Sequence, residues 1–410
     1  TEVAEWKRFV SIQDPFPLRR IAADLAAHDI HPPLYFWLLH VFAFLWGLTA
    51  CTGPVLNGLM FPLSVLALYA LARRALGEDP PAAAASFIWA MSPAVLYLTP
   101  RGRPYELFAL LTILFGWQLF RHLDRGESQR WYDYAALAGT TACGLLTHYH
   151  FGIVAAGGGL LLVWDFARSG DRSRAWALLA LAAGAAIFVG MHPLFWKSVL
   201  RPKADKHGVS VAEFFVRLRK VKGSLFYFLS NVRIGQLLII LGMASLAIYR
   251  LIRRSGPGEN RERVRIARDG QMSWSLHMLL WTAGGIFALY LSFLTPRHAM
   301  GPRYLTPMWP FVAVVAAGFL SSFDQWKGRR VVACACVLML MSGTVYALHY
   351  GAVTHSHRTV YAPRRVLIDN VSPGHLPRIV WHLPKGCEVY VARPGELLEK
   401  TETWMPKLSE

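Results

Sequence analysis

The acidic residues best placed for chemistry lie near the start of the chain. Glu2 and Glu5 stand in the polar opening segment, and the stretch "HDIHPPLYFW" sets Asp29 and His31 before a double proline. A carboxylate can take a proton from a reacting hydroxyl group, which is the role of a general base. Glu2 and Asp29 are therefore the candidate catalytic residues.

A second set of residues is basic or aromatic and suits an anion. Arginine binds phosphate through charge-assisted hydrogen bonds, and histidine and tyrosine add further donors. These residue types gather in the short motifs "TPRGRPY", "THYHF" and "TPRHAMGPRY". The candidate binding residues are His31, Arg101, Arg103, Tyr105, His148, His150, Arg297, Arg303 and Tyr304.

Most of these residues also have a plainer explanation. Arg101 and Arg103 could anchor the end of a membrane span at lipid head groups. His148 and His150 could form a divalent-metal pair, although no third ligand follows in the sequence. The double proline could simply begin a helix, with Asp29 as its cap.

Apolar segments of membrane-spanning length must position these side chains. Of the 410 residues, 54% are hydrophobic and 17% are charged, and the apolar runs approach the roughly 20 residues that cross a bilayer. Many runs are apolar on every face, unlike the helices of soluble proteins. We expect ten spans, at residues 55–72, 81–98, 105–120, 134–147, 151–166, 176–195, 234–249, 274–294, 305–322 and 331–349.

The arginine-rich connections assign the two sides of the membrane. "ARRALGE", "RHLDRGESQR", "RSGDRSR" and "KGRR" fall on one side when the spans alternate, and the positive-inside rule makes that side cytoplasmic. The candidate residues then gather on the outer side. Because a crossing at residues 34–50 would separate Asp29 from the other candidates, we expect this aromatic segment to lie in the membrane plane.

Charge and cysteine content exclude two other classes of site. The formal net charge of +18 comes largely from loop arginines, so nucleic acid is not a predicted partner. Positive charge on the outer side favours an anionic lipid head group instead. The five cysteines lie mostly within apolar runs and indicate neither a disulfide framework nor a thiolate metal site. No cofactor is required by the pattern.

The motifs, in this order, resemble those of the GT-C glycosyltransferases. This superfamily uses polyprenyl-phosphate-linked sugars and includes protein O-mannosyltransferases and bacterial lipid A aminoarabinose transferases. The resemblance lies in "TEVAEW", "HDIHPPLYFWLLHVFAFLWG", "LARRALG", "SPAVLYLTPRGRPYELFALL", "THYHF" and "PRYLTPMWPF". It implies an inverting transfer and a catalytic acid in the first outer loop, where Glu2 stands. Where relatives have Gln-Glu-Ala-Arg, this chain has Pro100-Arg101-Gly102-Arg103.

The sequence therefore predicts an all-α polytopic membrane protein with about ten transmembrane helices, an in-plane juxtamembrane helix and a small outward α/β cap. Residues 1–350 would form the transmembrane module, with its first helix upstream of Thr1, and residues 351–410 a periplasmic domain in which "CEVYVA" indicates a strand.

The predicted function is transfer of a hexose or pentose from a polyprenyl-phosphate donor to a lipid, polysaccharide or protein acceptor. The reaction would take place among membrane lipids, at the periplasmic face of a bacterial inner membrane. One alternative is a transporter or flippase of lipid-linked sugars, which would need charged or broken helices near the membrane centre. The other is a relative that binds the donor without catalysis.

Overall fold

The computed structural model describes residues 17–28, 31–47, 51–124, 128–192, 194–196, 302–321, 365–369 and 388–392. These residues belong to two units. The larger unit comprises residues 17–39 and the described residues from 53 to 321, and the smaller one holds residues 40–47, 51–52 and two strands. The predicted spans at 234–249, 274–294 and 331–349 lie outside the described residues.

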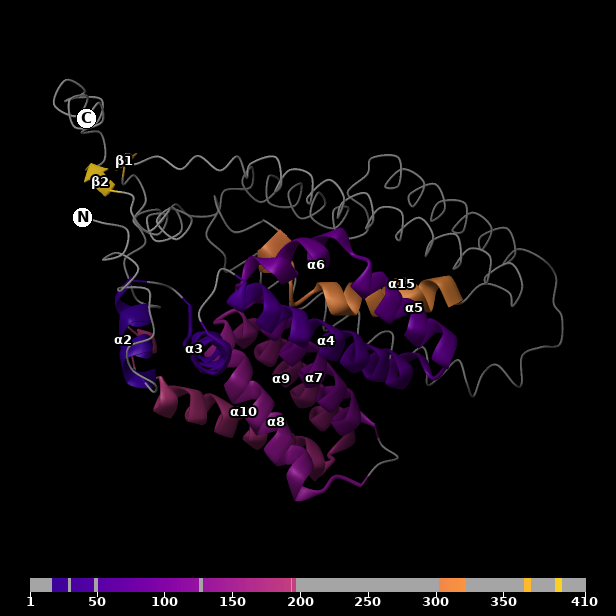
Figure 1. Cartoon of the computed structure of the whole chain (residues 1–410). Helices are drawn as coiled ribbons and strands as arrows, with labels where there is room; N and C mark the ends of the chain where they lie inside the picture. Colours follow the sequence, from indigo (N-terminus) through magenta and orange to yellow (C-terminus); the bar gives the residue numbers. More distant parts are fainter. Residues whose placement is uncertain are drawn as a thin grey trace, which may run out of the picture. The chain divides into compact units, whose positions relative to one another are not determined.

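The larger unit is a helical bundle (Figure 1). Its elements are α2 (Leu18–His28), the first part of α3 (Leu34–Trp46), α4 (Thr52–Leu76), α5 (Asp79–Ala90), α6 (Pro93–Leu98), η1 (Thr99–Arg101), α7 (Tyr105–Leu123), α8 (Trp131–Thr147), α9 (Phe151–Ser169), α10 (Arg172–Met191), η2 (Pro302–Leu305) and α15 (Trp309–Ser321). Helices α7, α8, α9 and α10 all contact one another, and α15 packs against α5 and α7.

Prolines and glycines set several helix limits. Helix α3 begins directly after the buried Pro33, since proline is well tolerated where a helix starts. Gly77 and Gly170 follow α4 and α9 with φ of 76° and 66°, a left-handed conformation that glycine adopts without steric cost. Of the segment predicted at residues 34–50, Leu34–Trp46 is confirmed as a helix, and its in-plane orientation remains a prediction.

The segment predicted as one span at residues 81–98 is broken into two helices, which together are still long and apolar enough to cross a membrane. Helices α5 and α6 meet at an angle of 40°. Ser92 is extended, with ψ of 124°, because a following proline disfavours the helical conformation, and Pro93 itself has no N–H to donate. The span predicted to begin at residue 305 also starts later, at Trp309, after the 3-10 turn η2.

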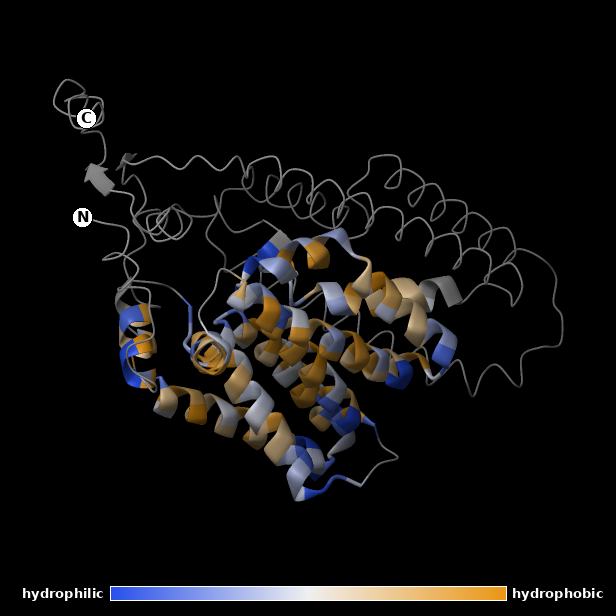
Figure 2. Cartoon of the chain, viewed as in Figure 1, coloured by the Kyte–Doolittle hydropathy of each residue, from blue (hydrophilic) through white to orange (hydrophobic). Residues whose placement is uncertain are grey.

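Helices α4, α9 and α10 are each long and apolar enough to cross a membrane, and α5 and α6 together would make a fourth such span among the described residues. Hydrophobic residues occupy most of the helix length and hydrophilic ones gather near the ends (Figure 2). Large apolar side chains such as Leu66, Leu160 and Trp176 are exposed. An apolar exterior of this extent suits contact with lipid.

Arg174 corrects the view of the "RSGDRSR" arginines as loop charges. Its side chain is buried, with 1% exposed. The guanidinium donates to Asp165 Oδ2 at 2.8 Å and to the backbone oxygen of Leu123 at 3.2 Å. This arginine therefore ties the ends of α7, α9 and α10 together inside the bundle.

Two further ion pairs lie at the same ends of the helices. Arg121 of α7 pairs with Asp133 of α8 at 2.9 Å, and Arg74 of α4 contacts Asp124, directly after α7, at 3.3 Å. In the described part of the chain, the arginine-rich ends around Arg74, Arg121 and Arg174 thus meet at one end of the bundle. This grouping is the one that alternating spans predict.

The smaller unit contains a two-stranded parallel sheet. Strands β1 (Arg365–Asp369) and β2 (Glu388–Ala392) pair in register, with Arg365 opposite Glu388. Strand β2 is the core of the "CEVYVA" motif, so the predicted strand is confirmed. The role of residues 351–410 as an outward domain remains a prediction.

Candidate active site at one end of the helical bundle

The arginine turn, Thr99–Arg103, carries two of the predicted binding residues. At its centre Gly102 has φ of 58°, which costs other residue types about 1–2 kcal/mol. The turn packs directly on the start of α4, since a Cβ added to Gly53 would lie 2.7 Å from the Cα of Gly102. Glycine at position 102 therefore lets the backbone reverse between Arg101 and Arg103.

Asn57 of α4 holds both ends of the arginine turn. Its side chain is fully buried, and Nδ2 donates to the backbone oxygens of Thr99 at 3.0 Å and Arg103 at 3.1 Å. An amide group has two hydrogens for these two acceptors. The backbone that carries Arg103 is thereby fixed to α4.

The two arginines of the turn have different environments. Arg101 is exposed, and its guanidinium stacks over the Tyr97 ring at 3.7 Å from the ring centre. Arg103 is half-buried near Tyr35 of α3. Burial raises the pKa of the Tyr35 hydroxyl, and the charge of Arg103 opposes part of that rise. Arg103 is therefore the less exposed of the two arginines and lies near Tyr35.

Glu106 is a buried acid in the first turn of α7, only 2% exposed. Its Oε1 lies 2.8 Å from Ser64 Oγ, and its Oε2 lies 3.0 Å from Thr99 Oγ1. Within the described part of the chain it forms no ion pair. Sequence reasoning missed this residue because an acid in the first turn of a helix is explained by the helix dipole alone.

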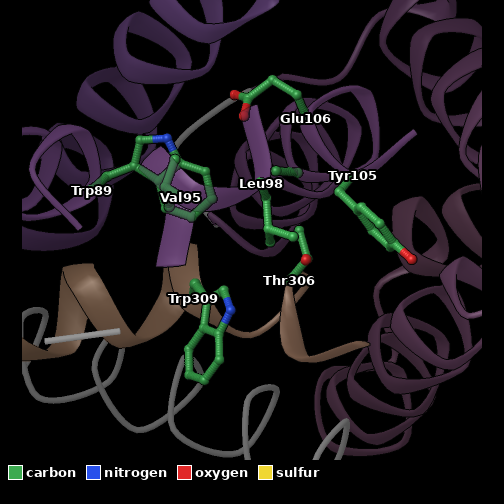
Figure 3. A pocket seen from close by; sticks show the side chains of 8 residues that line it. Trp89, Val95, Leu98, Tyr105, Glu106, Thr306 and Trp309 are labelled. Atoms are coloured by element: carbon green, nitrogen blue, oxygen red, sulfur yellow. The ribbon is translucent and has the colours of Figure 1, made fainter. Parts of the chain in front are cut away.

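A small pocket adjoins Glu106 (Figure 3). It is lined by Trp89, Val95, Leu98, Tyr105, Glu106, Ala109, Thr306 and Trp309. Thr306 Oγ1 donates to the backbone oxygen of Arg303 at 2.7 Å, and η2 contacts α6. The structure thus brings two arginine-bearing segments, far apart in the sequence, to the same pocket.

The predicted histidines form an aromatic cluster around Phe108. His148 stacks on Phe108 with ring centres 4.7 Å apart and planes 8° apart. The rings of His150, His31 and Tyr105 lie 4.6, 5.7 and 6.1 Å from that of His148. These residues come from the start of α3, the start of α7 and the α8–α9 connection, so the fold joins sites that are distant in the sequence.

His148 is held as a neutral imidazole. Burial lowers its pKa well below the ordinary value, and charge on His150 and His31 lowers it further. The backbone N–H of His150 donates to His148 Nδ1 at 3.2 Å. Because Nδ1 accepts, the ring proton of the neutral form lies on Nε2.

The remaining candidates are described in part or not at all. Arg303 is exposed in η2, and of Tyr304 only the backbone is described. Glu2, Asp29 and Arg297 lie outside the described residues. Across the described ranges no three or more histidine, cysteine or acidic side chains form a group that could hold a metal ion.

The apolar helices are those of a multi-pass membrane protein, and residues that flank the arginine turn line the same pocket as Thr306, which lies close to Arg303. Residues 30–196 match the family model described as dolichyl-phosphate-mannose-protein mannosyltransferase. A search of curated proteins gives no match.

Two solved structures match over 97% of this chain and 84% of their own. They are ArnT from Cupriavidus metallidurans bound to undecaprenyl phosphate, with a TM-score of 0.57 and 15% identity, and the same protein in the apo state, with 0.56 and 16%. The chain therefore shares the fold of ArnT, and both this fold and the match over residues 30–196 agree with the resemblance of the motifs to the GT-C glycosyltransferases.

Proposed function

We propose that this protein transfers a sugar from a polyprenyl-phosphate donor to an acceptor at the periplasmic face of a bacterial inner membrane. The observation that carries the proposal is the arginine turn, which is fixed by Asn57 and follows α6, the helix that contacts the η2 segment bearing Arg303. Guanidinium groups near the membrane surface suit the phosphate that joins the sugar to the lipid. The bound undecaprenyl phosphate of the similar ArnT structure supports this donor class.

In the proposed reaction, an acceptor oxygen attacks the anomeric carbon of the sugar. The bond from that carbon to the phosphate oxygen breaks, and its electron pair leaves with the polyprenyl phosphate. Attack opposite the leaving phosphate inverts the configuration at this carbon. Arg103 and Arg303 stabilise the negative charge that develops on the phosphate.

The acceptor loses a proton during this attack, and a carboxylate must take it. Family resemblance points to Glu2 as this base, with Asp29 in support. Glu2→Gln should then abolish transfer and leave binding of undecaprenyl phosphate nearly intact, because the shape is kept while the proton acceptor is lost. Normal turnover in Glu2→Gln, combined with an inactive Asp29→Asn, would move the role to Asp29.

The aromatic cluster is proposed to bind the substrate. Neutral His148 carries its proton on Nε2, so this ring can donate a hydrogen bond to an oxygen of the sugar or the phosphate. His31, Tyr105 and His150 surround it with further polar groups. A neutral donor contributes recognition without adding a charge that would compete with the arginines.

The break between α5 and α6 favours one second candidate, a transporter or flippase. Transporters often bind substrates where membrane helices are discontinuous, and this pair is bent at Met91–Ser92. A transporter would move the intact lipid-linked sugar across the bilayer, and the sugar–phosphate bond would survive.

The deciding experiment uses membranes that contain the full-length protein and defined radiolabelled polyprenyl-phosphate sugars. Label released from the lipid and joined to an acceptor would support the glycosyltransferase. Label that crosses vesicles while still linked to lipid would support the flippase, and binding without either event would support a non-catalytic relative. Arg103→Ala is the negative control, since it should weaken the donor-dependent signal.

A further inference from the structure

Too few protons are available for the contacts around Glu106 if its carboxyl group is ionised. Ser64 Oγ lies 2.7 Å from the backbone oxygen of Phe61 and 2.8 Å from Glu106 Oε1. Thr99 Oγ1 lies 2.9 Å from the backbone oxygen of Val95 and 3.0 Å from Glu106 Oε2. All four of these partners accept hydrogen bonds, but each hydroxyl group carries only one proton. Two of the four contacts would then lack a proton.

A protonated Glu106 supplies one more donor. Its O–H donates from Oε2 to Thr99 Oγ1, and the Thr99 hydroxyl then donates to Val95. Ser64 donates to Oε1 while it accepts a hydrogen bond from Trp89 Nε1 at 3.1 Å. Three of the four contacts then carry a proton.

Burial supports the same protonation state. An ionised carboxylate that is buried needs a cation to offset its lost hydration. Glu106 is 2% exposed and pairs with no cation in the described part of the chain. The pocket beside it is bordered by Trp89 and Trp309 (Figure 3), which present mostly apolar surface.

We propose that Glu106 is a positioning residue, held as a neutral carboxylic acid, that sets the arginine turn for binding of the donor phosphate. Glu106 bonds Thr99, the first residue of the turn, and Asn57 bonds Thr99 and Arg103. Through Thr99 and Asn57, Glu106 acts on the direction of Arg103 without touching the substrate. This inference rests on the proposed function, since the phosphate is the ligand that Arg103 would bind.

The neutral acid makes a specific prediction about substitutions. Glutamine keeps both a donor and an acceptor, so Glu106→Gln can donate to Thr99 and accept from Ser64. Alanine has neither group. Affinity for undecaprenyl phosphate should therefore stay within about threefold of wild type in Glu106→Gln and fall by about tenfold or more in Glu106→Ala.

The full-length protein in lipid nanodiscs is suited to this measurement. Equal losses in Glu106→Gln and Glu106→Ala would overturn the neutral state, because the charge itself would then be needed. Wild-type affinity in both variants would overturn the positioning role. In transfer assays the donor KM of Glu106→Ala should rise more than kcat falls, and a larger loss in kcat would also contradict positioning.

A second variant keeps the proposal testable if Glu106→Ala does not fold. Thr99→Val keeps the shape of the side chain but removes the hydroxyl that Glu106 contacts. It should weaken binding of undecaprenyl phosphate by a similar factor, because the contact between Glu106 and the arginine turn is lost. Wild-type affinity in Thr99→Val would contradict positioning through Thr99.

Infrared spectroscopy tests the protonation state without any activity. At neutral pH the spectrum of the wild-type protein should contain the carbonyl stretch of a protonated carboxylic acid, and Glu106→Gln should lose it. Glu78→Gln, at an exposed position at the start of α5, is the matched control and should leave this band unchanged. If the carbonyl band were unchanged in Glu106→Gln, the neutral state of Glu106 would be rejected. If the wild-type protein bound no undecaprenyl phosphate, the proposed function would fail while this spectrum still tested Glu106.

Discussion

Replacing Asn57 with alanine should both destabilise the protein and weaken the donor site. The change removes two hydrogen bonds, to the backbone oxygens of Thr99 and Arg103, from a side chain that is fully buried. A buried acceptor left without a partner costs about 1–3 kcal/mol, so two of them could cost about 2–6 kcal/mol. The lower value applies if the turn moves outward and its carbonyls find water.

That outward movement links stability to function. If the turn relaxes, Arg103 leaves the position from which it would meet the phosphate. A charge-assisted hydrogen bond is worth about 1.5–3 kcal/mol, so undecaprenyl phosphate affinity should fall by about tenfold or more. The free energy of unfolding should fall at the same time by about 2 kcal/mol.

Gln129→Ala is the matched control for Asn57→Ala. Gln129 also donates from a side-chain amide to a backbone oxygen, that of Arg121, at 2.8 Å, but at the arginine-rich end of the bundle. Thermal unfolding in detergent and binding of undecaprenyl phosphate in nanodiscs should be measured for both variants. The control should lose stability only. Unchanged affinity in Asn57→Ala would refute the view that this residue fixes the arginine turn for binding.

Three further predictions address charge. Arg103→Ala and Arg303→Ala should each lower donor affinity or transfer rate by about tenfold or more, measured with radiolabelled donor; unchanged kinetics at normal expression would make the residue a lipid anchor. Removing either member of the buried pair Asp165–Arg174 should cost about 3–5 kcal/mol in unfolding free energy, and a loss below about 1 kcal/mol would show that water reaches the pair. Because the pKa of His148 is lowered on folding, the unfolded chain binds the additional proton, so the free energy of unfolding should fall as pH drops below about 6.5. In His148→Asn the free energy of unfolding should depend less on pH in this range. An equal pH dependence in both proteins would assign the effect to other groups.

Much of the bundle is predictable from the sequence because it depends on local signals. Runs of apolar residues give the helices, and Gly77 and Gly170 give two of their ends. The break before Pro93 carried a signal as well, since a residue before proline disfavours helix. The prediction of one continuous span at residues 81–98 gave hydropathy more weight than the effect of Pro93 on the residue before it.

The buried polar contacts are harder to predict because they depend on which helices become neighbours. Arg174 has the same appearance in the sequence as the loop arginines around it, and only Asp165 from another helix makes its burial favourable. Asn57 and Glu106 likewise stand in apolar runs, where hydropathy assigns them no role. Their partners are 42 residues or more away or lie across a turn.

The candidate binding residues were predicted as a group because alternating spans would place them at one end, and among the described residues His31, Tyr105, His148 and His150 do lie together. The exposure of each arginine was not predictable, since it depends on the backbone of the arginine turn. With φ of 58° at Gly102, Arg101 lies on Tyr97 and Arg103 near Tyr35. An alanine at position 102 would favour a different turn, so the two arginines could not keep these separate environments. Glycine at position 102 therefore gives the two arginines separate environments, and under the proposed function it leaves Arg103 as the arginine that meets the phosphate.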